Sequence, residues 1–216
     1  MCGPILFLGW IFCKLYRILS YESKIEGMNA DVTGISAWQK GKNVLRQFYP
    51  DEYKESTYSI DFEALRKEGY KAILFDIDNT LVPHGAPADE RAKQLFDRLH
   101  SLGYRCMMLS NNKEPRVRSF CEEVKAGYIY KAAKPRRACY IKGMKMLKAD
   151  TTNTLFIGDQ IFTDIWGAKR AGIRTILVKP IDKKEEIQII LKRYLERIVL
   201  FFYLKEYKRA EKRHGN

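Results

Sequence analysis

The sequence contains no hydrophobic run long enough to span a bilayer and no cysteine pattern typical of a secreted protein. None of its apolar stretches reaches the ~20 residues that a transmembrane helix needs. The five cysteines are odd in number and include no Cys-x-x-Cys pair, which argues against a disulfide framework or a zinc site. We therefore expect a reducing, cytoplasmic environment, with peripheral attachment to the inner face of a membrane left open.

The first 45 residues lack a recognisable motif. Pro4–Cys13 is apolar but has neither the basic start nor the small-residue cleavage site of a signal peptide. Two interpretations stay open for it: a short anchor at a membrane interface, or an overextended reading frame whose true start is Met28. Residues 20–45 are polar and weakly patterned, so we expect a linker or a loose helix there.

The composition is that of a globular protein with a strong positive charge. Of the 216 residues, 46% are apolar and 30% are charged, and the formal net charge is +13. Residues 112–150 and 182–216 are basic, whereas residues 51–111 are slightly acidic. The excess charge predicts an anionic partner: a phosphorylated substrate, an acidic membrane surface or, less favoured, a nucleic acid.

Short apolar runs alternate with helix-like stretches from Lys71 onward. The apolar runs are Ala72–Phe75, Cys106–Leu109, Tyr128–Tyr130, Leu155–Ile157 and Thr175–Val178. The helix-like stretches are Ala88–Leu102, Glu114–Lys125, Arg137–Leu147 and Thr163–Ala171. This alternation predicts an α/β fold of the Rossmann-like kind, a doubly wound parallel sheet covered on both faces, with an extra C-terminal helix.

Polar residues follow four of these apolar runs at 24- to 34-residue intervals, namely Asp76, Ser110, Lys134 and Asp159. Such intervals are near the length of one strand–helix–strand unit. Ligands bind beyond the carboxyl ends of the strands in open α/β sheets, so we expect the four residues to meet at one edge.

The first motif places Asp76 and Asp78 two residues apart after a strand, followed by Thr80. Asp76 can attack phosphorus and form an aspartyl-phosphate. Asp78 can protonate the leaving oxygen and later deprotonate the hydrolytic water. Thr80 can support the turn that carries both acids. The alternative is an ordinary Asp-rich turn.

The second and third motifs can hold a phosphate. The Ser110 hydroxyl and the backbone N–H of Asn111 can donate to phosphate oxygens, although a Ser-Asn-Asn sequence also suits an ordinary loop or helix start. Lys134 can neutralise phosphate and the attacking carboxylate, although most lysines are merely solvated.

The fourth motif brings Asp159 and Asp164 to the same edge. Carboxylates gathered so closely cannot all stay ionised without a cation among them. Mg²⁺ fits best, since it is bound by one or two carboxylates, waters and a substrate phosphate oxygen.

In this order and spacing the set resembles the four-motif signature of haloacid dehalogenase (HAD) phosphatases, over about residues 46–200. Four finer matches resemble the YqeG-type HAD IIIA family, which is similar to the mitochondrial phosphatidylglycerophosphate phosphatases. They are Phe48–Tyr53, Asp78–Val82, Gly158–Asp164 and Glu196-Arg197.

The resemblance implies a role for each motif residue. Asp76 would be the nucleophile, Asp78 the acid and base, and Ser110 and Lys134 the phosphate contacts. The metal ligands would come from Asp76, Asp78 through its carbonyl, and Asp159. The implied substrate is phosphatidylglycerophosphate; the alternative is a macromolecular phosphate on RNA or a ribosome, although no RNA-binding motif is recognisable.

The chain has no room for a cap domain over the site. Only 29 residues separate Thr80 from Ser110, and one helix and one strand use nearly all of them. A capless phosphatase cannot enclose a small metabolite, but it can act on a phosphate carried by a large body. A lipid head group at a membrane satisfies that condition, and so does a macromolecule.

Two basic segments have more than one interpretation. In a helix over 137–148 we expect Cys139, Tyr140, Gly143, Met146 and Leu147 on one side, opposite a basic, solvated side. Residues 198–204 are apolar all round and flanked by bases, which suits either a membrane-interface helix or docking on the protein itself or a dimer partner. The predicted division of the chain is 1–45, 46–181 and 182–216.

Overall fold

A computed structural model describes residues 45–182 and 187–214. Residues 50–185 form one compact unit, and the C-terminal helix belongs to another together with the segment that ends at Tyr49. Apart from Leu45, the predicted N-terminal segment 1–45 lies outside the described residues. The three-part division of the chain therefore stays a prediction.

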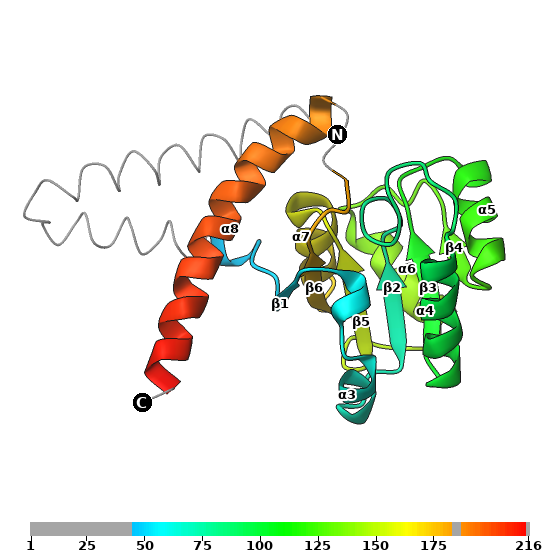
Figure 1. Cartoon of the computed structure of the whole chain (residues 1–216), viewed down its shortest axis with the longest axis horizontal. Helices are drawn as coiled ribbons and strands as arrows, with labels where there is room; N and C mark the ends of the chain where they lie inside the picture. Colours follow the sequence, from blue (N-terminus) through cyan, green and yellow to red (C-terminus); the bar gives the residue numbers. More distant parts are fainter. Residues whose placement is uncertain (1–44, 183–186, 215–216) are drawn as a thin grey trace, which may run out of the picture. The chain divides into compact units, whose positions relative to one another are not determined.

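The larger unit is built on one parallel sheet of six strands (Figure 1). The strands are β1 (Glu52–Lys54), β2 (Ala72–Phe75), β3 (Arg105–Leu109), β4 (Gly127–Ile129), β5 (Thr154–Gly158) and β6 (Arg174–Val178). They lie in the order β1-β6-β5-β2-β3-β4, so β2 is central and the chain winds outward in both directions from it. The predicted doubly wound α/β fold is confirmed.

Helices connect the strands and cover the sheet. They are η1 (Thr57–Ser59), α3 (Phe62–Lys67), α4 (Glu90–Ser101), α5 (Glu114–Glu123), α6 (Arg137–Met146), η2 (Ile161–Ile165) and α7 (Trp166–Arg170). Asp61 and Asp89 cap α3 and α4, each accepting a backbone N–H from three residues further on. The helix expected over 163–171 begins earlier, with the π-helical turn η2.

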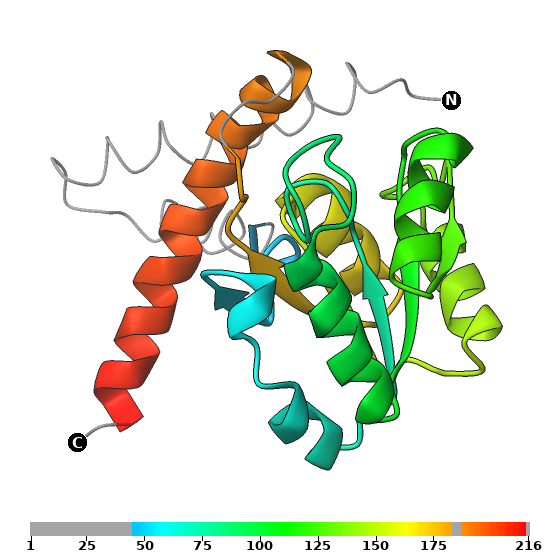
Figure 2. The ribbon, with the colours of Figure 1, turned by 45° about the vertical axis from the view of Figure 1, so that its right-hand side comes forward.

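Each strand sends alternate side chains to two hydrophobic cores, one on either face of the sheet. In β2, Ile73 and Phe75 join a core formed with α3, α4 and α5. Ala72 and Leu74 join the opposite core, formed with α6 and α7. Figure 2 shows α4 in front of β2, on one face of the sheet. Because both faces are covered, β2 is fully buried and the residue after it is held in a dry, rigid setting.

One side-chain assignment in α6 was wrong. We expected Met146 on the apolar side, but it is 52% exposed, whereas Met144 is buried. Cys139, Tyr140 and Gly143 are buried as expected. The helix ends at Met146. Met144 is buried instead because its side chain lies one turn from Tyr140 on the same face of the helix.

The edge strand β1 was not predicted. Its three residues, Glu-Tyr-Lys, contain no apolar run, and the strand forms by pairing with β6. Asp51 fixes the start of the strand, since its carboxylate accepts the backbone N–H and the hydroxyl of Thr175, both at 2.8 Å. Lys169 Nζ donates to the other oxygen of Asp51 at 2.9 Å.

No cap domain is inserted between β2 and β3, as expected, or between β3 and β4. The chain between β2 and β3 forms only a loop and α4, and the chain between β3 and β4 forms only α5. The loop rises above the carboxyl end of β2 (Figure 2). Two residues of η1 secure it: Thr57 Oγ1 donates to the carbonyl of Thr80 at 2.7 Å, and Tyr58 Oη donates to that of Leu81 at 2.6 Å.

The C-terminal helix α8 runs from Ile187 to His214. The apolar run 198–204 is buried on one side only. Val199, Phe202 and Tyr203 are buried, whereas Phe201 is 58% exposed. The ring of Tyr203 packs edge-on against Tyr49 at 5.6 Å. Part of the run therefore packs within the protein. Among the described helices, none is both long and apolar enough to cross a membrane.

Candidate active site

The central strand β2 delivers Asp76 to the carboxyl edge of the sheet. Asp76 follows the buried Phe75, and its own side chain is about one-tenth exposed. Lys134 lies between two aspartates there, with Nζ 2.6 Å from Oδ1 of Asp76 and 2.6 Å from Oδ1 of Asp164. The Lys134 side chain is 3% exposed, so the interpretation of this lysine as merely solvated is wrong.

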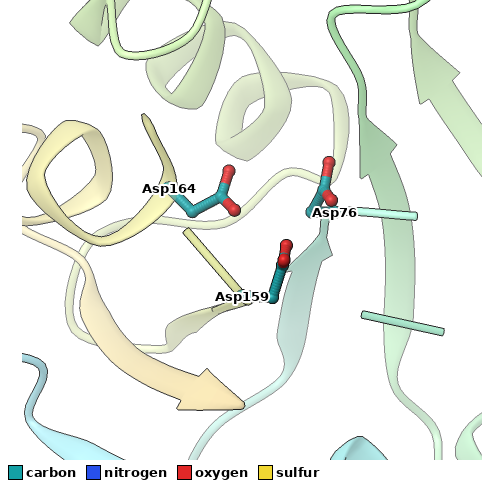
Figure 3. Close-up of side chains that lie close together, drawn as sticks. All are labelled: Asp76, Asp159 and Asp164. Atoms are coloured by element: carbon teal, nitrogen blue, oxygen red, sulfur yellow. The ribbon is translucent and has the colours of Figure 1, made fainter. Parts of the chain in front are cut away.

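Three carboxylates converge at this edge of the sheet (Figure 3). One oxygen from each of Asp76, Asp159 and Asp164 lies within 4.8 Å of the others, and all three residues are buried. Three aspartates and one lysine carry a net charge of two negative if all are ionised. A buried, all-oxygen donor set with that charge fits a divalent cation, which would offset the charge.

Burial and the neighbouring charges both shift the pKa values of Asp76 and Lys134. Burial raises the pKa of Asp76 well above its usual value; Lys134 opposes the rise, and the charges of Asp164 and Asp159 reinforce it. Burial alone would lower the pKa of Lys134, but attraction to Asp164 and Asp76 outweighs it and raises that pKa. The lysine is therefore firmly protonated and available to hold an anion.

A close backbone approach positions Asp164. A Cβ on Gly158 would lie 2.7 Å from the Cβ of Asp164, so only glycine leaves room for that side chain. The backbone N–H of Gln160 donates to Oδ2 of Asp164 at 3.1 Å. Tyr140 on α6 donates its hydroxyl to the carbonyl of Thr163 at 2.8 Å, which braces the turn η2 from the side.

The turn after Asp76 connects the first motif to the fourth. Asn79 has φ of 63°, in the left-handed region that asparagine tolerates better than most residues. The hydroxyl of Thr80, expected to support its own turn, donates to Oδ1 of Asp159 at 3.2 Å. Thr80 thus links the ends of the neighbouring strands β2 and β5.

Ser110 and Asn111 lie at the end of β3, beside the lysine. Ser110 is buried, and its Oγ accepts the backbone N–H of Asn112 at 3.1 Å. The side-chain oxygen of Asn111 accepts the backbone N–H of Lys134 at 2.8 Å, and its amide nitrogen donates to the Lys134 carbonyl at 3.3 Å. The Asn111 side chain thus positions Lys134, while contact of its backbone N–H with phosphate stays a prediction.

The carboxylate of Asp78 lies outside the group of three and is held by other donors. Oδ1 accepts from the backbone N–H of Gly85 at 2.8 Å and from Nη2 of Arg116 at 3.0 Å, and Oδ2 accepts from Nδ2 of Asn112 at 2.6 Å. Sequence reasoning missed Arg116 and Asn112. Asn112 was visible inside the Ser-Asn-Asn motif, but nothing in the sequence distinguishes Arg116 from its neighbours.

Comparison with known proteins identifies the family of the chain. The pattern of the haloacid dehalogenase-like hydrolases matches residues 85–172. The chain is 33% identical over 159 residues to "Probable phosphatase YqeG" of Bacillus subtilis (strain 168), covering 73% of this chain and 92% of that one. The chain belongs to the haloacid dehalogenase-like hydrolases. It is a phosphatase of that family.

Two more distant matches have names that state a substrate. This HAD phosphatase is 26% identical over 196 residues to "Phosphatidylglycerophosphate phosphatase 1, chloroplastic/mitochondrial" of Arabidopsis thaliana, covering 83% of this chain and 53% of the relative. Among solved structures, the cobalt-bound deoxy-D-mannose-octulosonate 8-phosphate phosphatase of Haemophilus influenzae aligns with a TM-score of 0.43 and 16% identity, covering 51% of this chain and 69% of that one.

Proposed function

We propose that this HAD phosphatase is a Mg²⁺-dependent phosphomonoester hydrolase that works through an aspartyl-phosphate on Asp76. The contact of Lys134 with Asp76, inside a buried group of three aspartates, carries the proposal. Asp76 has the position of a nucleophile because it leaves the central strand toward the site. Lys134 supplies the fixed positive charge that an incoming phosphoryl group requires.

In the first step, a carboxylate oxygen of Asp76 attacks phosphorus and the bond from phosphorus to the leaving oxygen breaks. Asp78 gives its proton to that oxygen, which leaves as an alcohol. The Ser110 hydroxyl and Lys134 hold the non-bridging phosphate oxygens through this step. Asn112, Gly85 and Arg116 orient the Asp78 carboxyl group.

In the second step, water attacks the same phosphorus, Asp78 takes a proton from it, and Asp76 is released with inorganic phosphate. Asp76, Asp159 and the Asp78 carbonyl would hold Mg²⁺, and Asp164 would support the site through Lys134. When bound, the ion orients the phosphate and offsets its developing negative charge.

The substrate we favour is phosphatidylglycerophosphate. The Arabidopsis relative named for that activity supports it, at 26% identity. The capless architecture is also compatible, because a lipid head group at a membrane can present its phosphate without being enclosed. The alternative is a phosphate carried by a macromolecule such as RNA, which the net charge of +13 would attract.

We expect the purified protein to hydrolyse phosphatidylglycerophosphate in mixed micelles with kcat/KM at least about tenfold above that for a 5′-phosphorylated RNA oligonucleotide. The reason is that no RNA-binding motif accompanies the site. Phosphate release over a panel containing both, with p-nitrophenyl phosphate as a general reporter, measures this. Faster release from the RNA would instead favour the alternative.

We further propose that α8 binds an anionic membrane surface through its exposed side. This side carries Tyr194, Arg197, Phe201, Lys205 and Lys208, spaced three or four residues apart. Arg197 lies over the ring of Tyr194 at 5.4 Å, and Lys205 lies over that of Phe201 at 5.8 Å. Exposed aromatic rings beside bases suit the boundary between head groups and acyl chains.

The double change Phe201→Ser and Lys205→Gln should weaken binding to phosphatidylglycerol-containing vesicles by about tenfold or more. An interfacial Lys contributes about 1 kcal/mol, and loss of the exposed ring removes apolar burial as well. Co-sedimentation across a salt series measures the change. Met146→Ser, which removes an exposed apolar side chain from α6, is the matched control and should bind as wild type does.

Equal binding of the double variant and the wild type would rule this surface out. If the wild type binds RNA but no vesicles in the same salt series, the basic residues serve the alternative function. If the double variant instead dissociates a dimer in sedimentation equilibrium, the surface is an interface between two copies of the chain.

A further inference from the structure

Arg116 on α5 has hydrogen-bonding capacity that the described part of the protein does not use. Nη2 donates to Asp78 at 3.0 Å, and the side chain is 20% exposed. Its Nε–H is buried and has no hydrogen-bond partner in the part of the chain that the structure describes. An unpaired buried N–H is costly and uncommon in folded proteins, so its presence beside a reacting group requires an explanation.

The surroundings keep this guanidinium near the site. It lies 5.7 Å from the ring centre of Phe120, one turn further along α5, which restricts the side chain to this side of the helix. Asn112 already donates to the second oxygen of Asp78, so Arg116 is not the sole support of that carboxylate. An arginine carries five N–H donors, and only one of these is used by Asp78.

The position of Arg116 determines which part of a bound substrate it can contact. In the proposed mechanism the leaving oxygen departs on the side opposite to Asp76 and takes its proton from Asp78. Since Arg116 contacts Asp78, it lies near the group attached to the leaving oxygen rather than near the phosphoryl group, which Lys134 holds. Arg116 is thus a candidate for recognising the leaving group of the substrate.

We propose that Arg116 binds a second anionic group, of the phosphate-ester type, on the alcohol that leaves. Arginine is suited to this because its planar fork pairs with phosphate oxygens through two parallel N–H donors. The flanking loops add positive charge, since Lys113 and Lys131 are both exposed there. The backbone N–H of Lys131 donates to the carbonyl of Asn112 at 3.0 Å, which places this loop beside Asp78.

This inference rests on the proposed function and narrows it. The preferred substrates are phosphomonoesters whose leaving alcohol carries a second phosphate group, as a phosphoglycerol head group does. Monoesters of neutral alcohols would bind Lys134 in the same way but leave the donors of Arg116 unpaired. The exposed part of the guanidinium would then lack an anionic partner, and a site built to pair with a substrate group discriminates against a substrate that lacks it.

Two soluble probes built on the same glycerol test the inference. Glycerol 3-phosphate releases neutral glycerol as its leaving alcohol, whereas glycerol 1,3-bisphosphate releases glycerol 1-phosphate, an alcohol that still carries the second phosphate. We expect the wild type to show a kcat/KM about 10- to 100-fold higher for the bisphosphate, the range of a charge-assisted bond. Arg116→Gln should remove this preference while lowering turnover of glycerol 3-phosphate by a smaller factor, and Arg116→Lys should retain only part of it.

The matched control is Arg118→Gln on the same helix. Arg118 is 55% exposed and pairs with Glu114, away from Asp78, so both probes should react as with wild type. The inference is overturned if Arg116→Gln lowers kcat/KM for both probes by the same factor, since Arg116 would then act only by positioning Asp78. It is also overturned if the wild type shows no preference between the probes.

Failure of this inference can be told apart from failure of the proposed function. If the wild type hydrolyses phosphatidylglycerophosphate in micelles but Arg116→Gln retains the preference between the probes, only the role of Arg116 is wrong. If the wild type hydrolyses p-nitrophenyl phosphate but neither the micellar lipid nor the bisphosphate, the proposed substrate is wrong as well. Thermal unfolding of each variant, followed by circular dichroism, checks that the fold is intact.

Discussion

An Asp76→Asn variant should lose at least about 10⁴-fold in turnover while keeping its fold, because an amide cannot take the place of the attacking carboxylate. Asparagine has nearly the same shape and retains an oxygen that can accept the hydrogen bond from Lys134. The loss should appear in kcat with p-nitrophenyl phosphate as substrate. Asp97→Asn, on the exposed side of α4, is the matched control and should be fully active.

The same variant should be more stable than the wild type in chelator. Burial, opposed by Lys134 and reinforced by Asp164, holds the pKa of Asp76 well above its usual value. The folded protein therefore binds this proton more tightly than the unfolded chain, and stability is lost as pH rises above about 4. The advantage of the variant should grow as the pH rises above about 4.

Thermal unfolding in EDTA at several pH values measures this difference. Each kcal/mol gained should raise Tm by about 2–4 °C for a chain of this size. Near-normal activity of Asp76→Asn would end the assignment of Asp76 as nucleophile. A Tm advantage that shrinks with rising pH would show that the excess negative charge in the cluster has been misjudged.

Removal of divalent metal should reduce activity to background, and Mg²⁺ should restore it. Asp76, Asp159 and Asp164 with Lys134 carry a net charge of two negative if ionised, which one Mg²⁺ would cancel. Binding to the folded state alone also stabilises it, by about 2.7 kcal/mol when Mg²⁺ exceeds its Kd a hundredfold. We therefore expect Mg²⁺ to raise the Tm of the chelator-treated wild type.

Asp159→Asn should abolish the rise in Tm caused by Mg²⁺, independently of its effect on turnover. NaCl at matched ionic strength is the control for general screening and should leave the Tm nearly unchanged. The metal assignment fails if the chelated enzyme keeps full activity. It also fails if Mg²⁺ raises the Tm of Asp159→Asn by as much as that of the wild type.

The fold was largely predictable because the sheet is buried on both faces. Continuous apolar runs such as Ala72–Phe75 and Leu155–Ile157 identify parallel strands, and they lie within the observed β2 and β5. The edge strand β1 escaped prediction because its three residues are half-exposed and of mixed polarity. Its conformation depends on β6 and on Asp51, which lie far apart in the sequence.

The topology made it possible to predict that Asp76, Lys134 and Asp159 lie close together, because each comes after a strand of one parallel sheet. The contacts of the Asp78 side chain could not be predicted in this way. Arg116 reaches it from the first turn of α5, and that reach depends on how the preceding loop orients the helix. Likewise, no sequence pattern predicted that Asp164 would come from a π-helical turn with its Cβ packed against Gly158.

The pairing of β2 with β5 also affects when the active site can form during translation. Phe75 pairs in register with Ile157, so the strand that carries Asp76 leaves the ribosome about 80 residues before its neighbour. At 5–20 residues per second, that delay is roughly 4–16 s. During this interval a nascent chain has Asp76 but not Asp159 or Asp164 beside it. Catalytic competence should therefore arise late, when β5 pairs with β2 during or after the last part of translation.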